Sequence, residues 1–577
     1  MKKVFGFYLK PYYLRMFGGF VIKFLGTIMD LLIPWVLAYI IDNVVPTGNL
    51  THVFLWGVAM LIFSLCALFG NIFANRFAAK VAELSMRRIR KDLFVKVSEL
   101  SCGQVDEFTE SSLVTRLTAD TYNVHNAIGM VQRLGVRAPI LLVGGICVTL
   151  TLDKVLALVL VSMLPFLSII VITVSKKGIP LYSKQQKAVD GLICKLRENI
   201  TGVRVIRALS QTELEKERFD EINKEVVKRE TTAAVTMGIT NPAMNFILNM
   251  GWVLVILIGA HRVNAGVMEG GKIVAFLTYF TIILNAMLMV TRLFVRFSQA
   301  SASAGRIMQV IDTCTDWKMV EDCYDSEGGE KMVTEEQDFI RFKNVTFSYI
   351  PGKTILKDIN FSLKKGESLG IIGATGSGKT TIINLLMRFY EADSGDIYID
   401  GKNVMSMTEE DLRKRFGVAF QNDTMFEDTV YENISLYRHI EEARVLEAAE
   451  DADIASHIEK MEGGLQAGIA IKGANLSGGQ KQRMLIARAL AGNPEILVLD
   501  DSSSALDYKT DAKVRGAINS RYKEATTIII AQRVSSVMNC DKIILLEKGQ
   551  IAGYGSHETL LAECEEYREI SKMQLEA

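Results

Sequence analysis

The stretch SLGIIGATGSGKTTIINLL, residues 368–386, predicts the fold of the C-terminal half of the chain. Residues 369–372 have the composition of a buried strand, residues 373–378 are rich in glycine, and the residues after Lys379 favour a helix. Residues 373–380 fit the pattern GxxxxGK[ST] in the strand–loop–helix order that this pattern requires. Glycines in such a loop let backbone N–H groups close around phosphate oxygens at the start of a helix. The stretch therefore predicts an α/β domain that binds a nucleotide through its phosphates.

The polar residues of this loop have separate predicted roles. Lys379 would reach the β- and γ-phosphates of ATP, and the hydroxyl of Thr380 would ligate Mg²⁺. The apolar run PEILV leads into Asp500, about 120 residues further on, and an acid at the end of such a strand is a second candidate Mg²⁺ ligand. The remaining candidates for phosphate binding are Gly373, Ala374, Thr375, Gly376, Ser377, Gly378 and Thr381.

Composition divides the chain into two kinds of sequence. The 577 residues include 65 Lys and Arg and 65 Asp and Glu, and this neutrality argues against nucleic acid as the main partner. The mean hydropathy is +0.22, with the apolar residues concentrated in the first ~300 positions. The eight cysteines form no CxxC pair, so we expect reduced thiols and neither a disulfide framework nor a zinc site.

The N-terminal half contains six apolar segments long enough to cross a bilayer, for which about 20 residues suffice. They are residues 16–45, 53–75, 134–152, 155–175, 231–260 and 273–291. The third and fourth segments are separated by residues 153–154 alone, which predicts a helical hairpin. We read the N-terminal residues as a cytosolic lead-in to the first span and not as a cleaved signal peptide.

The connecting segments predict the orientation of the chain. Residues 76–133 and 176–230 are long, basic and patterned like helices, whereas 46–52, 153–154 and 261–272 are short and nearly free of Lys and Arg. The excess of basic residues places the two long segments and both termini in the cytoplasm.

Lys23 and Asp30 lie within the first span, seven residues apart and on one face of the predicted helix. A charge in a membrane usually faces a cavity or a partner. The alternatives are a direct Lys23–Asp30 pair, or a Lys23 ammonium that reaches the inner headgroups.

The segment NLSGGQKQRMLIARAL, residues 475–490, lies between the phosphate loop and Asp500. LSGGQ in this position resembles the signature of the ATP-binding cassette family. With six preceding spans, nearly the whole chain resembles an ABC exporter half-transporter, in particular the degenerate-site subunit of a bacterial heterodimeric multidrug-type exporter. The fold expected is multidomain: an all-α six-helix transmembrane domain at 1–312, a linker at 313–339, and an α/β P-loop ATPase domain at 340–577.

The resemblance assigns further residues. Tyr349 matches the aromatic residue that stacks on adenine, and Gln421 matches the glutamine that senses Mg²⁺ and the γ-phosphate. Residues 504–507 match the D-loop, and residues 111–124 and 198–209 resemble the segments that dock on the ATPase domains. The signature residues Leu476, Ser477, Gly478, Gly479 and Gln480 would contact the ATP bound by a partner cassette.

Three positions depart from the pattern of the family. The residue after the magnesium-binding aspartate is usually a glutamate, the general base that orients the attacking water, and here it is Asp501. The residue before Arg533 is usually a histidine, and here it is Gln532, whose amide can neither take up a proton nor carry charge. A third departure is Ile471, where exporters often have an acid that faces the docking helix of the other subunit.

The LSGGQ signature is intact, so the deficits fall on the site that contains this chain's own phosphate loop. We therefore predict a heterodimer in which this subunit binds ATP with Mg²⁺, hydrolyses it slowly, and completes the active site of a second half-transporter. The alternatives are a slow homodimeric exporter, an ATP-gated or regulatory membrane protein, and a soluble ATPase with a hydrophobic interaction domain. Drugs, lipids and other small amphipathic substrates are all compatible with the spans, and the absence of sorting signals favours a bacterial plasma membrane.

Overall fold

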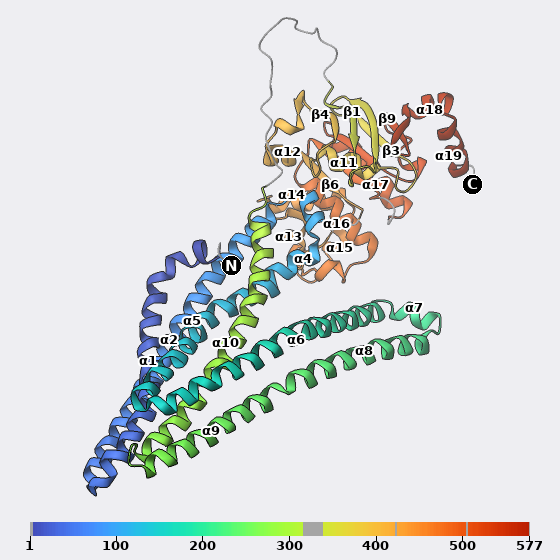
Figure 1. Cartoon of the computed structure of the whole chain (residues 1–577). Coiled ribbons are helices and arrows are strands. Elements are labelled where there is room, and N and C mark those ends of the chain that lie inside the picture. The colour runs from blue at the N-terminus through green and yellow to red at the C-terminus, as the bar shows by residue number, and fades with distance from the viewer. Residues whose placement is uncertain (1–3, 315–337, 422–423, 503–505, 576–577) are drawn as a thin grey trace, which may run out of the picture. The chain divides into compact units, whose positions relative to one another are not determined.

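The computed structural model describes residues 4–314, 338–421, 424–502 and 506–575. The chain folds as two compact units (Figure 1). The helical unit contains Met1–Glu99 and Thr109–Thr313, and the α/β unit contains Leu100–Phe108 and Cys314–Ala577. Most of the predicted linker, residues 315–337, lies outside the described residues, so the predicted domain limits remain predictions.

Six long helical segments build the helical unit, and each contains one of the predicted spans. The prediction of six membrane-crossing helices is therefore confirmed. The principal helices are α1 (Tyr13–Tyr39), α2 (Leu50–Ser98), α5 (Thr121–Leu152), α6 (Lys154–Thr201), α8 (Thr212–Gly238), α9 (Thr240–Asn264) and α10 (Gly270–Ile311), with α4 (Glu110–Thr115), the π-helical turn η5 (Arg116–Asp120) and α7 (Val203–Ala208) between them.

The helices extend far beyond the apolar segments. The 49 residues of α2 make it about 73 Å long at 1.5 Å per residue, more than twice the thickness of the hydrocarbon core. Its second half, like the second half of α6, continues through the basic sequence that follows the span. The long segments predicted as cytoplasmic are thus largely continuations of the membrane helices.

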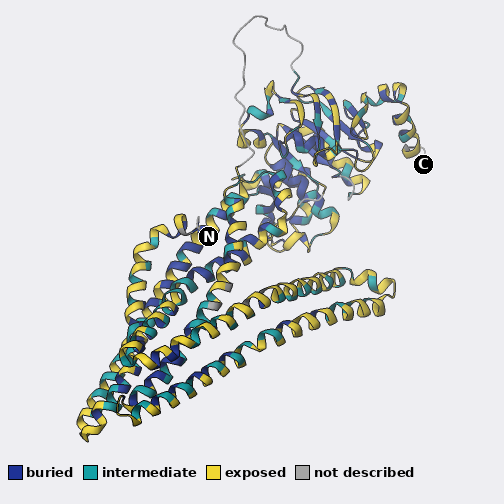
Figure 2. Ribbon diagram, in the orientation of Figure 1, coloured by how far each residue is buried: buried dark blue, intermediate teal, exposed yellow. Residues whose placement is uncertain are grey.

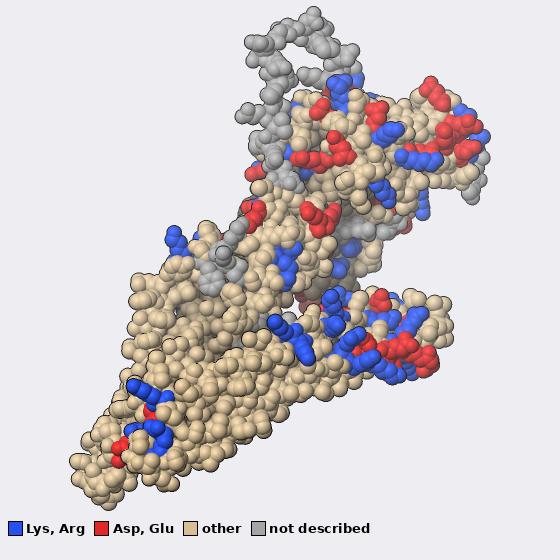
Figure 3. All heavy atoms as spheres, in the orientation of Figure 1, with Lys and Arg blue, Asp and Glu red and all other residues tan. Residues whose placement is uncertain are grey.

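Side-chain exposure agrees with a bilayer around this unit. Large apolar residues such as Phe54, Leu158 and Leu257 are exposed, and Figure 2 shows exposed residues along the outer faces of the helices. Figure 3 shows a broad surface without charges along the helices, with Lys, Arg, Asp and Glu gathered at the α7 end of the α6–α8 pair and in a second group near the opposite end of the helices. An uncharged apolar surface of this kind needs lipid or protein to cover it.

The predicted tight turn between the third and fourth spans lies at Asp153. Its carboxylate accepts hydrogen bonds from the backbone N–H groups of Val155 and Leu156, at 2.9 and 3.0 Å, and caps α6. Arg262 at the end of α9 forms an ion pair with the same carboxylate at 3.0 Å. One acidic residue therefore ends the α5–α6 turn and ties it to α9.

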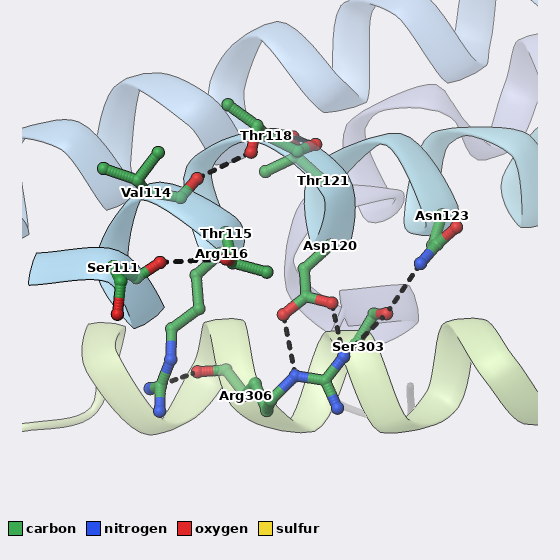
Figure 4. A network of polar contacts seen from close by, with 10 residues as sticks. All are labelled: Ser111, Val114, Thr115, Arg116, Thr118, Asp120, Thr121, Asn123, Ser303 and Arg306. Carbon is green, nitrogen blue, oxygen red and sulfur yellow. Dashed lines mark hydrogen bonds and ion pairs between the residues drawn. The ribbon is translucent and has the colours of Figure 1, made fainter. Parts of the chain in front are cut away.

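A network of polar contacts joins η5 and α5 to α10 near their polar ends (Figure 4). The carboxylate of Asp120 is almost fully buried and accepts two hydrogen bonds from the guanidinium of Arg306, one of them 2.8 Å long from Nε. Arg116 donates to the backbone carbonyl of Arg306 at 3.0 Å, and Asn123 donates to the hydroxyl of Ser303 at 3.2 Å. A buried carboxylate is expensive unless it is paired, so this contact fixes the register of the two helices.

The α/β unit contains two sheets. The first is antiparallel, in the order β2 (Leu356–Leu363), β1 (Ile340–Phe347), β4 (Ser394–Ile399), β5 (Lys402–Asn403). The second has the order β10 (Gln550–Gly555), β9 (Lys542–Glu547), β3 (Ser368–Ile372), β8 (Thr526–Ile530), β7 (Ile496–Asp500), β6 (Phe416–Ala419). In the second sheet β10 is an antiparallel edge and the other pairings are parallel.

The parallel pairings bring the carboxyl ends of β3, β7 and β8 to the same edge of the sheet. Ligands of open α/β sheets bind outside that edge. The buried strands are almost continuous runs of Ile, Leu and Val, as expected for strands covered on both faces.

The α/β unit also includes a short helix from the first half of the sequence, α3 (Cys102–Phe108). Gln104 donates to the backbone carbonyl of Cys314 at 2.7 Å, and the hydroxyl of Tyr390 donates to Asp106 at 2.6 Å. Residues 102–108 of the first basic region are grouped with the α/β unit and the predicted docking segment 111–124 with the helical unit, so the docking role of 111–124 remains a prediction. The second predicted docking segment, 198–209, remains a prediction.

Candidate functional site

The phosphate loop lies between β3 and α11 (Lys379–Leu386). Gly376 and Gly378 have φ of +82° and +103°, a region that L side chains rarely adopt. A Cβ on Gly373 would lie 2.2 Å from the carbonyl oxygen of Leu546, so the loop can follow this path only with glycine there. The glycines of the motif thus have the conformational roles that the sequence predicts.

Lys379 begins α11 and folds back over the loop. Its ammonium donates to the backbone carbonyls of Gly373 and Ala374, at 2.8 and 2.9 Å. Burial lowers the pKa of Lys379, although the carboxylates of Asp500 and Asp501 act in the opposite direction. The ammonium therefore lies over the loop that would surround the phosphates.

Asp500 is the last residue of β7 and is 3 % exposed. Its Oδ2 accepts a hydrogen bond of 2.9 Å from the hydroxyl of Thr380, which brings the two predicted magnesium ligands together. Burial raises the pKa of Asp500, and the bond from Thr380 partly offsets this effect.

Asp501 follows in the left-handed conformation, with φ of +47°. Its carboxylate Oδ2 accepts hydrogen bonds from the side-chain amides of Gln421, at 2.9 Å, and Gln532, at 3.4 Å. Burial raises the pKa of Asp501, while Lys379 and Arg533 lower it. The structure therefore brings Gln421 and Gln532 to the carboxylate of the candidate base, Asp501.

Tyr349 contacts α11, the helix that follows the phosphate loop. Its hydroxyl is 3.3 Å from Thr381 Oγ1 and accepts a hydrogen bond of 3.2 Å from Asn384. The ring meets Tyr390 edge-on with 4.9 Å between centroids, and the side chain remains 42 % exposed. An exposed aromatic ring at this position can stack on a nucleotide base.

These residues surround a cavity of about 310 Å³. It is lined by Tyr349, Ile355, Thr375, Gly376, Gly378, Lys379, Thr380, Thr381, Gln421, Asp500, Asp501, Ile530, Ala531 and Gln532. The sequence analysis missed the apolar members Ile355, Ile530 and Ala531. Ile530 ends β8, so its place beside the end of β3 follows from the parallel pairing of these strands and not from any motif.

The signature residues lie elsewhere in the α/β unit, outside that cavity. Ser477 caps α16 (Gly478–Ala491) in a capping box with Gln480, whose amide also approaches His457 Nδ1 at 3.3 Å. Ser477 and Gly478 are exposed at the start of the helix. The signature is thus preformed and accessible.

Of the predicted D-loop, Ser504 and Ala505 lie outside the described residues. Asp507 caps α17 (Tyr508–Arg521) by accepting a hydrogen bond of 3.0 Å from the backbone N–H of Thr510.

Comparison with known proteins identifies the family. The model of the ABC transporter transmembrane region matches residues 16–287, and the ABC transporter model matches residues 356–504. An uncharacterized ABC transporter ATP-binding protein of Bacillus subtilis, YfiB, is 34 % identical over 576 residues, which cover 100 % of this chain and 98 % of YfiB.

The chain is an ABC transporter. It joins one transmembrane region to one ATPase domain, so it is a half-transporter and a multi-pass membrane protein. The ATP-dependent lipid A-core flippase 1 of Colwellia psychrerythraea is 29 % identical, with 99 % of this chain and 95 % of that protein covered. A bacterial Atm1-family ABC exporter solved with ATP bound has the same fold, with a TM-score of 0.82, 23 % identity, and coverage of 97 % and 98 %.

The residues of the half-transporter's cavity fit ATP and Mg²⁺. The hydroxyl of Ser377 is buried, and among the described residues it has no hydrogen-bond partner, so it is available to a phosphate oxygen. Mg²⁺ in proteins is usually held by one or two carboxylates together with waters and substrate phosphates. Asp500 with the hydroxyl of Thr380 matches that donor set, and the amide of Gln421 lines the same cavity.

The membrane helices of the half-transporter contain a second polar cluster, formed by Lys23, Asp30, Asn71, Asn75 and Arg137. Asp30 pairs with Arg137 at 2.9 Å and accepts a hydrogen bond of 3.4 Å from Asn71. Lys23 is 3 % exposed and donates to Asn75 at 3.2 Å. Asp30 is therefore paired with Arg137 and not with Lys23, and the burial of Lys23 contradicts the idea that it reaches the headgroups.

Proposed function

We propose that this half-transporter pairs with a different half-transporter, binds ATP at a slow site of its own, and supplies LSGGQ to the faster site of its partner. The observation that carries the proposal is the environment of Asp501. Its short carboxylate is held by two amides, from Gln421 and Gln532, at the place where hydrolysis needs a well-placed base.

The chemistry of these groups supports a slow site. An amide at position 532 can donate a hydrogen bond to a phosphate oxygen or to Asp501, but it cannot take up a proton. Asp501 is one methylene shorter than glutamate, and a displacement of about 1 Å can lower a rate roughly 10²-fold. Bound Mg²⁺ supplies charge stabilisation at the phosphates. Thr380 and Asp500 would hold it, while Lys379 and the loop N–H groups would orient the phosphates.

The signature supports a role toward a partner. Ser477 and Gln480 form a complete capping box, so the N-terminus of α16 presents ordered donors at an exposed surface. A chain with a weakened base and an intact signature is best used in a heterodimer, because a homodimer would contain two weakened sites. The partner is expected to carry glutamate and histidine at the positions of Asp501 and Gln532.

We propose a small amphipathic cargo. The relative from Colwellia is named as a lipid A-core flippase, which supports a cargo with an apolar part. Lys23, Asp30 and Arg137 lie in the membrane helices, and a polar group of the cargo could exchange with Asn71 or Asn75 there. The proposed location is the bacterial plasma membrane, with both termini in the cytoplasm because the basic segments 76–133 and 176–230 favour that side.

The proposal is tested by purifying the tagged chain from its native membrane in mild detergent and identifying its companions by mass spectrometry. The expected result is a second half-transporter in equal amount, with glutamate after its magnesium-binding aspartate. A homodimer, or a partner with the same Asp and Gln, would refute the asymmetric mechanism. ATP-dependent movement of a fluorescent lipid by the reconstituted complex would separate a transporter from an ATP-gated or regulatory protein.

A further inference from the structure

The last helix of the chain, α19 (Glu565–Leu575), ends against the segment that carries Gln532. The side-chain amide of Gln574 makes two hydrogen bonds to the backbone of that segment. Its Oε1 accepts from the N–H of Val534 at 2.7 Å, and its Nε2 donates to the carbonyl of Gln532 at 3.1 Å. One side chain thus bridges the residues on either side of Arg533.

The helix that carries Gln574 is anchored independently of these bonds. The ring of Tyr567 on α19 is fully buried in an apolar cluster that also contains Val534 and Val537. Leu560 and Cys564, which precede α19, belong to the same cluster. Because α19 is fixed by packing, Gln574 can act as an external support for the backbone at 532–534.

The segment 532–534 contacts the candidate base, Asp501, through the side chain of Gln532. The side-chain amide of Gln532 donates to Asp501 at 3.4 Å, and the charge of Arg533 acts on the same carboxylate. The distance of 3.4 Å is long for a hydrogen bond, so a small displacement of the backbone would break this contact. Two hydrogen bonds therefore connect α19 to Asp501: Gln574 bonds to the backbone of Gln532, and the side chain of Gln532 bonds to Asp501.

We infer that Gln574 is a positioning residue for the γ-phosphate side of the ATP site. It holds the 532–534 backbone so that the Gln532 amide and the Arg533 charge lie at Asp501. The inference rests on the proposed function for the identity of the site, and it adds a residue from a helix about 40 positions further along the chain. Gln574 does not itself line the cavity, and it contacts the lining residue Gln532 at its backbone carbonyl, so its effect passes through the backbone.

The test compares Gln574→Ala with Met573→Ala in the full-length complex purified from its native membrane. Met573 is the neighbour of Gln574 on α19 and is 73 % exposed, which makes it a matched control. Three quantities are measured: amide hydrogen exchange over residues 530–538, the Kd for Mg-ATP, and single-turnover hydrolysis at the site of this chain. The partner's base is replaced by glutamine so that only this site reports.

We expect Gln574→Ala to speed exchange of the Val534 amide by about 10-fold, as for the loss of one ordinary hydrogen bond. Hydrolysis should fall 3- to 10-fold while the Kd for ATP changes less than twofold, and Met573→Ala should change none of the three. In a Gln532→Ala background the effect of Gln574→Ala on hydrolysis should shrink to less than twofold, because the two residues act in series.

Two outcomes would overturn the inference. In the first, exchange at Val534 rises but hydrolysis is unchanged. In the second, Gln574→Ala lowers hydrolysis and ATP affinity together, or lowers hydrolysis by the same factor in the wild-type and Gln532→Ala backgrounds. Either result would indicate a merely structural role for Gln574. If Gln574→Ala does not fold, Gln574→Glu keeps the acceptor for Val534 and removes the donor to Gln532.

The failure of the proposed function would look different. If hydrolysis in the wild-type chain is no faster than in an Asp500→Asn control, the slow site itself is inactive. The same comparisons are then made in an Asp501→Glu, Gln532→His chain, where an unchanged rate on Gln574→Ala would still overturn the inference.

Discussion

Asp501→Glu tests the role of the short carboxylate most directly. In the structure the Asp501 carboxylate accepts from Gln421 at 2.9 Å and from Gln532 at 3.4 Å, so the shorter contact is well formed and the longer one is weak. Glutamate would extend the carboxylate by one methylene from the same backbone position. We expect hydrolysis at this site to rise while ATP affinity stays the same, because the residues that hold the phosphates are unchanged.

The expected size follows from the displacement. A misplacement of about 1 Å corresponds to roughly 10²-fold in rate, or about 2.7 kcal/mol in activation free energy. Since Gln532 still replaces a histidine, we expect only part of this, an increase of about 10- to 50-fold. The left-handed backbone of Asp501 suits aspartate better than glutamate, so the variant should also lose up to about 1 kcal/mol of stability.

The assay is single-turnover hydrolysis of radiolabelled ATP in the complex with the partner's base disabled, together with the Kd for ATP and a thermal melt. Asp501→Asn is the matched control, because it keeps the size of the side chain and removes the charge. If Asp501→Glu leaves the rate unchanged while Asp501→Asn abolishes it, then aspartate already serves as a fully competent base and the concept of a slow site is wrong.

Three further changes have defined outcomes. Asp500→Asn should abolish Mg-dependent ATP binding, yet raise the melting temperature of the nucleotide-free protein at pH 7 by a few degrees. Burial raises the pKa of Asp500 in the native state, so the native state binds this proton more tightly than the unfolded chain does. The wild-type protein therefore loses stability as the pH rises from the unfolded pKa of Asp500 through its native pKa, and an uncharged asparagine side chain at this position avoids this loss. Asp120→Ala should lower the free energy of unfolding of the helical unit by about 2–3 kcal/mol in a denaturant titration. This is less than for a fully buried ion pair, because Arg306 is half exposed and water can hydrate its charge. Asp120→Asn should lower the free energy of unfolding by a smaller amount. Ser477→Ala removes the capping box with Gln480 and should cost about 1 kcal/mol, seen as faster amide exchange in the first turn of α16, with slower hydrolysis at the partner's site.

The sequence determined those features that depend on local pattern. Glycine at 373, 376 and 378 follows from backbone approach and positive φ, and the apolar runs are long enough to span a bilayer whatever their neighbours are. The contact of Thr380 with Asp500 could also be anticipated, because the ends of parallel strands meet at one edge. The departures from the family pattern, aspartate at 501 and glutamine at 532, can also be seen in the sequence alone.

Other features were decided by tertiary structure alone. The pairing of Asp30 with Arg137 joins residues 107 positions apart, and the support of Gln532 by Gln574 joins residues 42 positions apart. Neither contact has a local signature, since a lone glutamine on a polar helix or an arginine near the start of a span is compatible with many partners. The choice of partner depends on which helices pack together and in what register, and that is set by the burial of whole apolar faces and not by any short stretch of the chain.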